Sequence, residues 1–119
     1  MMLVMGGIFF VSHQPGSAIH LLQFPGSDKL AHALAYAVLA ASVLFALPPS
    51  PRRPWRGLVL VFVVCSLYGI SDEVHQSFIP LRSADPLDWL ADSLGAGVFL
   101  LAWAAFQPSR SARAASRAK

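Results

Sequence analysis

Apolar segments long enough to cross a lipid bilayer dominate this chain. Segments 30–47 and 86–106 hold 18 and 21 residues, close to the roughly 20 that a membrane-spanning helix requires. Segment 57–78 reaches a similar length once its polar end is included. Segment 2–11 is shorter and rises only about 15 Å as a helix, about half of the hydrocarbon thickness. The chain therefore predicts an all-α, four-helix transmembrane bundle with short loops and a short or truncated first helix.

The composition favours a membrane protein over a soluble one. Hydrophobic residues make up 55% of the 119 residues and charged residues only 13%, whereas about a quarter of the residues in soluble domains are charged. A chain of this length forms a single domain. We expect residues 1–107 to form the transmembrane domain and residues 108–119 a basic cytoplasmic tail. The one cysteine, Cys65, lies in an apolar segment and has no partner for an intrachain disulfide.

The basic residues predict the orientation of the bundle. Most of them lie either between the second and third segments or after the fourth: Arg52, Arg53, Arg56, Arg110, Arg113, Arg117 and Lys119. Because cytoplasmic loops are enriched in Lys and Arg, we expect this end and both termini to face the cytoplasm. A basic tail beside a membrane is expected to contact lipid headgroups, so no nucleic-acid partner is predicted. All acidic residues and all histidines belong to the opposite end.

Polar residues at that opposite end recur at helical spacing in three segments. Residues three or four apart lie on one face of a helix. The sets are, by segment, Asp28, His32 and Tyr36; Tyr68, Asp72, Glu73, His75 and Gln76; and Asp85, Asp88 and Asp92. Gly95 continues the last set with a residue small enough for close helix contact.

His32, Glu73 and Asp92 are expected to lie one to two turns inside the membrane boundary. A charged group that faces lipid at such a depth costs on the order of a few kcal/mol. We therefore expect the three side chains to turn inward and to meet in one pocket. That pocket would be either a hydrogen-bonded cluster or a water-filled cavity that opens outward. None of the three is at a helix end, so a capping role does not account for them.

Other polar residues fit structural roles. The sequence ADPLD predicts a helix start, with Asp85 as the N-cap, Pro86 in the first turn and Asp88 near the positive helix end. Ser27 and Asp28 form a similar helix start, in which Asp28 is either a cap or a site residue.

The basic residues of this end also have simple expected roles. Arg82 is expected to be the counter-ion of Asp85 or Asp88, and Lys29 to extend toward the membrane interface. His13 and His20 lie in a polar connection and are expected to be solvated.

Two motifs combine most of these residues: SDKLAHALAYAVL at 27–39 and YGISDEVHQSFIPLRSADPLDWLADSLGAG at 68–97. They resemble the VanZ-like family of small bacterial membrane proteins, and FFVSHQP at 9–15 resembles that family's end of helix one. The elements DK-x-x-H-x-x-x-Y and DE-x-HQ-x-F-x-P-x-R occur in order and at the right separation. Two features depart from the family pattern. The first helix is short, and Leu81 stands where a glycine commonly precedes the arginine.

The resemblance implies a four-helix protein of the bacterial cytoplasmic (inner) membrane, linked to resistance to the glycopeptide teicoplanin. It implies no established chemistry. The polar signature is matched at Asp28, Lys29, His32, Tyr36, Asp72, Glu73, Gln76, Arg82, Asp88 and Asp92.

The first functional hypothesis is binding or modification of a lipid-linked cell-envelope substrate. The expected partners are membrane lipids and a lipid-linked cell-wall precursor or glycopeptide, and no cofactor is predicted. His32, Glu73 and Asp92 would be catalytic, with Glu73 or Asp92 as general base and His32 as its acid–base partner. Substrate binding would fall to Asp28, Lys29, Tyr36, Asp72, Gln76, Arg82 and Asp88, among which Arg82 or Lys29 would hold an anion.

Two other hypotheses remain open. His32, Glu73, Asp88 and Asp92 offer nitrogen and oxygen ligands for a metal-assisted hydrolase, although no H-x-x-x-H or H-E-x-x-H pattern supports it. A non-enzymatic bundle that binds a partner or has a structural role would use the same polar residues without catalysis. Such a bundle would tolerate Glu73→Gln but not the loss of Arg82.

Overall fold

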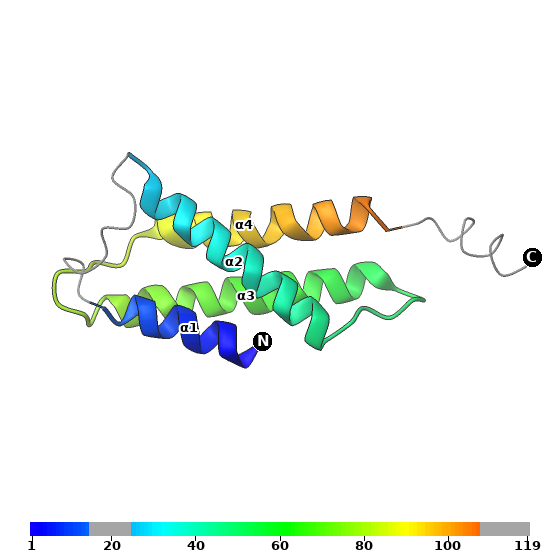
Figure 1. The fold of residues 1–119 in the computed structure, drawn as a ribbon, viewed down its shortest axis with the longest axis horizontal. Helices are drawn as coiled ribbons and strands as arrows, with labels where there is room; N and C mark the ends of the chain where they lie inside the picture. Colours follow the sequence, from blue (N-terminus) through cyan, green and yellow to red (C-terminus); the bar gives the residue numbers. More distant parts are fainter. Residues whose placement is uncertain (15–24, 108–119) are drawn as a thin grey trace, which may run out of the picture.

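Four helices make up the fold of the computed structural model, which describes residues 1–14 and 25–107. They are α1 (Met2–Ser12), α2 (Ser27–Ala46), α3 (Pro54–Gln76) and α4 (Pro86–Ala105). The described residues contain no strand. The helices run up and down along a long bundle (Figure 1). This arrangement confirms the predicted all-α bundle with a short first helix.

The two ends of the bundle differ in charge. The end of α1, the start of α2 and the α3–α4 connection lie together (Figure 1), and we call this the acidic end. The α2–α3 connection, which carries Arg52, Arg53 and Arg56, lies at the other end, the arginine end. The separation follows the predicted division of basic and acidic residues. The expected basic tail, 108–119, lies outside the described residues.

Three of the helices have the dimensions of membrane spans. α2, α3 and α4 are each long and apolar enough to cross a bilayer, whereas α1, with 11 residues, is shorter. Their outward faces are apolar: Phe45, Leu67 and Leu101 are 91%, 60% and 74% exposed. Such a surface is stable against lipid but not against water. The protein is therefore a membrane protein.

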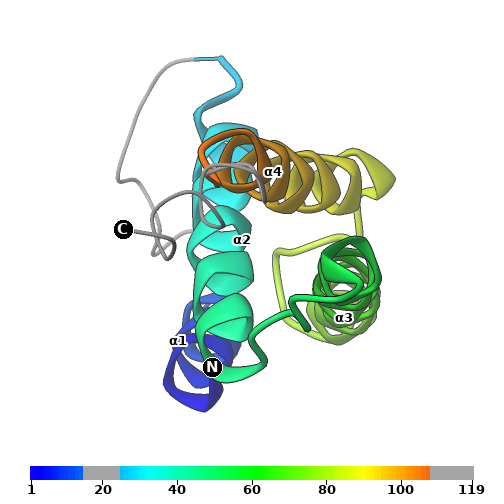
Figure 2. The same ribbon diagram turned by 90° about the vertical axis from the view of Figure 1, so that its right-hand side faces the viewer.

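The core is built from small and branched side chains of α2, α3 and α4. Leu39, Val43, Val61, Cys65 and Ala96 are all completely buried. α2 makes its most extensive contacts with α4 and is inclined across the bundle (Figure 2). α1 contacts α2 and α3 but not α4 in the described part of the chain. The core therefore rests on three helices, and α1 covers one side of it.

The close approach of α2 and α4 depends on Gly95. A Cβ added at this position would overlap the carbonyl oxygen of Ala33 and come within 2.6 Å of its Cα. Only a glycine permits this helix separation. The predicted close contact at Gly95 is thereby confirmed.

The helix starts agree in part with the sequence analysis. Asp85 is the N-cap of α4 and accepts a hydrogen bond from Leu87 N at 2.9 Å. Pro86 follows in the first turn and Asp88 lies there too, as predicted. At α2 the N-cap is Gly26, with a left-handed φ of 83°. Asp28 therefore lies in the first turn, and the prediction that it is the N-cap is wrong.

Leu81, in the α3–α4 connection, has a φ of 62°. This left-handed conformation costs a non-glycine residue roughly 1–2 kcal/mol. This conformation explains why a glycine suits the position before Arg82. Because this chain has Leu81 there, its backbone is strained at that position.

Leu81→Gly is therefore expected to stabilise the protein by about 1 kcal/mol. The gain is partly offset by the greater freedom of glycine in the unfolded chain. Equilibrium unfolding in mixed detergent micelles measures the change in free energy. Leu81→Ala is the matched control, because it also removes the exposed side chain but keeps a Cβ. If alanine stabilises as much as glycine, backbone strain is not the cause.

Candidate functional site

His32, Glu73 and Asp92 meet near the acidic end, each contributed by a different helix. One potential ligand atom from each lies within 4.8 Å of the others. Asp92 is completely buried, Glu73 is 7% exposed, and the His32 side chain is 18% exposed. Residues of α2, α3 and α4 converge here because each helix turns its polar face away from lipid. The predicted convergence is confirmed, and the catalytic roles stay predictions.

His32 bridges two carboxylates of α4. Its Nδ1 lies 2.9 Å from Asp92 Oδ1, and its Nε2 lies 3.9 Å from Asp88 Oδ2. Asp88 and Asp92 are one helical turn apart, so one imidazole reaches both. An ionised carboxylate only accepts hydrogen bonds, so Nδ1 donates to Asp92. In the neutral imidazole Nε2 is then free to accept a proton or a ligand.

Glu73 joins the end of α3 to the start of α4. Its Oε2 accepts a hydrogen bond from Asp85 N at 2.8 Å. Its other oxygen, Oε1, is buried and has no hydrogen-bond partner among the described residues. Glu73 thus has a structural contact on one oxygen and a free acceptor on the other.

Asp92 is held against α3 through Gly69. A Cβ at Gly69 would lie 3.2 Å from Asp92 Oδ2, so the glycine leaves room for the carboxylate. Oδ2 is buried without a hydrogen-bond partner in the described part of the chain. Asp92 therefore also keeps one free acceptor.

Lys29 is the counter-ion of the α4 start. Its Nζ lies 3.0 Å from Asp85 Oδ2, 2.8 Å from Asp88 Oδ1 and 3.4 Å from Asp28 Oδ2. The backbone N–H of Leu87 and the Lys29 ammonium hold the pKa of Asp85 below its usual range. Lys29, in the first turn of α2, therefore connects α2 to the start of α4 through these ion pairs.

The expected pairing of Arg82 with Asp85 or Asp88 is wrong. Within residues 25–107 those acids are paired by Lys29 and His32, while Arg82 Nη1 donates to Gln76 Oε1 at 2.8 Å. The reason is geometric, because the first turn of α2 approaches α4 closely and brings Lys29 within reach. The guanidinium of Arg82 is thus left without a carboxylate within ion-pair distance in the described part of the chain.

A chain of hydrogen bonds links Arg82 to α1. Gln76 Nε2 donates to Asp72 Oδ2 at 3.0 Å, and Ser12 Oγ donates to the same oxygen at 2.8 Å. Ser12 and Asp72 are buried. Ser12 was not among the predicted site residues, although it lies within the FFVSHQP motif at the end of α1. This network explains why Asp72 and Gln76 belong to the polar signature.

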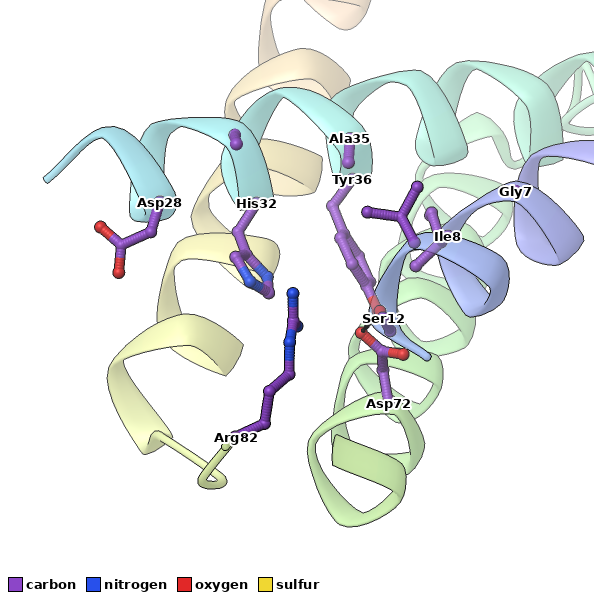
Figure 3. Close-up of a pocket in the computed structure, with 11 residues that line it drawn as sticks. Gly7, Ile8, Ser12, Asp28, His32, Ala35, Tyr36, Asp72 and Arg82 are labelled. Atoms are coloured by element: carbon purple, nitrogen blue, oxygen red, sulfur yellow. Dashed lines mark hydrogen bonds between the residues drawn. The ribbon is translucent and has the colours of Figure 1, made fainter. Parts of the chain in front are cut away.

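A cavity of about 280 Å³ lies between α1 and α2 beside this network. Arg82 extends into it from the α3–α4 connection, between His32 and the Ser12–Asp72 pair (Figure 3). Ile8 and Ala35 contribute apolar wall. The cavity therefore presents a cation and an imidazole at one place and apolar surface at another.

The remaining predicted binding residues lie around the cavity or at its rim. Tyr36 lines it, is 1% exposed, and has a hydroxyl without a hydrogen-bond partner among the described residues. Asp28 also lines it, but its side chain is 64% exposed and points away from His32 (Figure 3).

A second histidine pair lies at the acidic end. His13 Nδ1 and His75 Nε2 are 3.2 Å apart, and both rings contact Phe9. His13 is exposed as expected, but the prediction that it is simply solvated misses this contact between α1 and α3. His20 lies outside the described residues.

Three apolar spans, a short first helix and an enclosed ionisable cluster near one end define a multi-pass membrane protein with a buried polar site. The chain belongs to the VanZ/LLP1 family, whose family model matches residues 1–107. The match confirms the resemblance seen in the two motifs. Neither a curated protein nor a solved structure matches the chain.

Proposed function

We propose that this protein binds a lipid-linked, anionic cell-envelope molecule at the outer face of the bacterial cytoplasmic membrane and modifies it, so that the host tolerates glycopeptides such as teicoplanin. The observation that carries the proposal is the cluster of His32, Glu73 and Asp92, whose His32 also lines a cavity together with Arg82. In the described part of the chain this arginine bonds to Gln76 and to no carboxylate. A purely structural cluster would be expected to pair that arginine with one of the nearby acids.

The orientation follows from the two ends of the bundle. Arg52, Arg53 and Arg56 lie in the α2–α3 connection, and a cluster of arginines next to a span favours the cytoplasmic side. The acidic end then faces outward, with both termini in the cytoplasm. Envelope precursors and glycopeptides are accessible on that side.

The proposed chemistry divides the site into a binding part and a reacting part. The Arg82 guanidinium holds the anionic group of the substrate, since it offers several donors in a fixed plane. The apolar cavity wall at Ile8 and Ala35 receives the lipid-like part. His32, oriented by Asp92, transfers a proton at its free nitrogen, and the free oxygen of Glu73 acts as a second base.

Glu73→Gln is expected to abolish teicoplanin tolerance while the protein still accumulates in the membrane. Glutamine keeps an oxygen that accepts from Asp85 N but cannot act as a base. The measurement is the growth-inhibiting teicoplanin concentration of a susceptible host that expresses each variant, normalised to protein abundance. Ser71→Ala, at an exposed position of the same helix, is the matched control and should behave as wild type.

The contact between Glu73 Oε2 and Asp85 N favours a second candidate, a bundle that binds its partner without catalysis. Arg82→Ala separates the two. Full tolerance in Glu73→Gln together with loss in Arg82→Ala supports the binding protein and removes the catalytic proposal.

A further inference from the structure

Three buried carboxylates near the acidic end have no Lys or Arg partner among the described residues, although one of them, Asp92, contacts His32. Asp72, Glu73 and Asp92 are 4%, 7% and 0% exposed, and no Lys or Arg of the described residues lies within ion-pair distance of them. In the described ranges Lys29 pairs with Asp28, Asp85 and Asp88, and Arg82 donates to Gln76. Buried charges are costly unless they are paired or coordinate a metal. The described residues therefore supply no Lys or Arg to balance the charge of these three buried carboxylates.

Each of these carboxylates also has one oxygen without a hydrogen-bond donor in the part of the chain that the structure describes. Asp72 Oδ1, Glu73 Oε1 and Asp92 Oδ2 are buried and without a partner among the described residues. Nearly all buried polar groups in proteins are hydrogen-bonded, so such a group requires an explanation. Two of these three oxygens belong to the cluster that also contains His32. A positive ligand within the cluster would satisfy both the charge and the free oxygens.

The geometry of the cluster suits a metal ion. Ligand atoms of His32, Glu73 and Asp92 lie within 4.8 Å of one another. Around a tetrahedral ion with bonds of about 2.1 Å, ligand atoms are about 3.4 Å apart. Small side-chain rotations close this difference. Gly69 leaves space beside Asp92 for such a rotation, because no Cβ confines the carboxylate there.

We infer that His32, Glu73 and Asp92 form a binding site for a divalent transition-metal ion, Zn²⁺ or Mn²⁺. One imidazole and two carboxylates fit these ions, whereas Mg²⁺ and Ca²⁺ take oxygen ligands. Three protein ligands leave at least one position open, as in catalytic rather than structural sites. In this site the ion takes Nδ1 of His32, in place of the hydrogen bond from Nδ1 to Asp92. Nε2 then faces Asp88 Oδ2 at 3.9 Å, so Asp88 is placed to orient the imidazole.

The metal ion would add a catalytic group to the proposed function. This catalytic role of the ion rests on the proposed function. An anionic substrate group held by Arg82 would lie beside the open metal position, where the ion can polarise it or activate a water molecule. Metal binding itself is measured without any substrate.

The test is metal binding by the full-length protein in detergent. After chelation and re-loading with Zn²⁺ or Mn²⁺, elemental analysis should find about one ion per chain, and titration calorimetry should give one site. Each of His32→Ala, Glu73→Gln and Asp92→Asn should weaken binding by about 100-fold or more, because loss of a ligand should exceed the roughly 10–100-fold cost of losing an outer-shell partner. His75→Ala, which removes a nearby imidazole of α3, is the control and should bind as wild type.

Co²⁺ gives a second measurement that uses only the wild-type protein and therefore does not depend on whether the variants fold. Wild-type protein loaded with Co²⁺ should show visible absorption bands that disappear when Zn²⁺ is added. Absence of both a bound ion and these bands overturns the inference. So does binding that is lost in His75→Ala and kept in His32→Ala, since the metal would then sit at the His13–His75 pair. If the wild-type protein binds no metal but Glu73→Gln still loses tolerance, the proposed function stands and only the metal site is ruled out.

Discussion

Gly95→Ala should prevent the native packing of α2 against α4. The added Cβ would overlap the carbonyl group of Ala33 and lie 2.6 Å from its Cα. These are backbone atoms of a helix, which cannot rotate away as a flexible side chain does. The two helices must separate, and the cost is expected to be about 3 kcal/mol or more. Equilibrium unfolding in mixed micelles and the monodisperse fraction in gel filtration measure the loss.

Gly97→Ala provides the matched control two residues further along α4. A Cβ there meets only the Phe62 ring, at 3.5 Å, which is ordinary contact distance. It should change stability little, or increase it slightly because alanine is the better helix former. If Gly95→Ala is as stable as Gly97→Ala, the close crossing of α2 and α4 is wrong, and so is the explanation for the reach of Lys29.

The same crossing shows what sequence reasoning could predict. The four helices and the meeting of His32, Glu73 and Asp92 followed from segment length, helical spacing and the cost of charges in lipid. These arguments determine which face of a helix turns inward. They do not determine how near two helices approach.

Helix separation decides the partners at the acidic end. Lys29 reaches Asp85 and Asp88 because α2 lies close to α4. Arg82 instead donates a hydrogen bond to Gln76. From the sequence alone, Arg82 was the nearer basic residue and therefore the expected counter-ion.

The depth of the short first helix was a second unknown. Ser12 contacts Asp72, and His13 contacts His75, only because α1 ends at the level of the last turns of α3. An eleven-residue helix has no length constraint that fixes its position in a bilayer. Spacing within α1 therefore could not reveal either contact.

Loss of the imidazole of His32 should cost far more than loss of its carboxylate partner. In His32→Ala the completely buried Asp92 loses its only hydrogen-bond donor among the described residues, Nδ1 at 2.9 Å. Removal of one member of a buried ion pair costs about 3–5 kcal/mol, because the remaining charge has no compensation. We expect about 3 kcal/mol for His32→Ala in metal-free protein, measured by unfolding in micelles that contain a chelator.

Asp92→Asn should cost only about 1 kcal/mol, the net value of an ordinary hydrogen bond. His32 can become neutral, its side chain is partly exposed, and the amide oxygen of asparagine still accepts from Nδ1.

The double variant should recover most of the stability lost in His32→Ala, since no buried charge is left behind. Such recovery gives a clearly non-zero coupling energy, whereas the effects of independent sites simply add. His75→Ala serves as the control for loss of an imidazole outside the cluster and should change stability by less than about 1 kcal/mol. Equal losses in His32→Ala and Asp92→Asn, or no recovery in the double variant, would mean that Asp92 is uncharged in the native protein, and His32 could not then act through an Asp92–His32 pair.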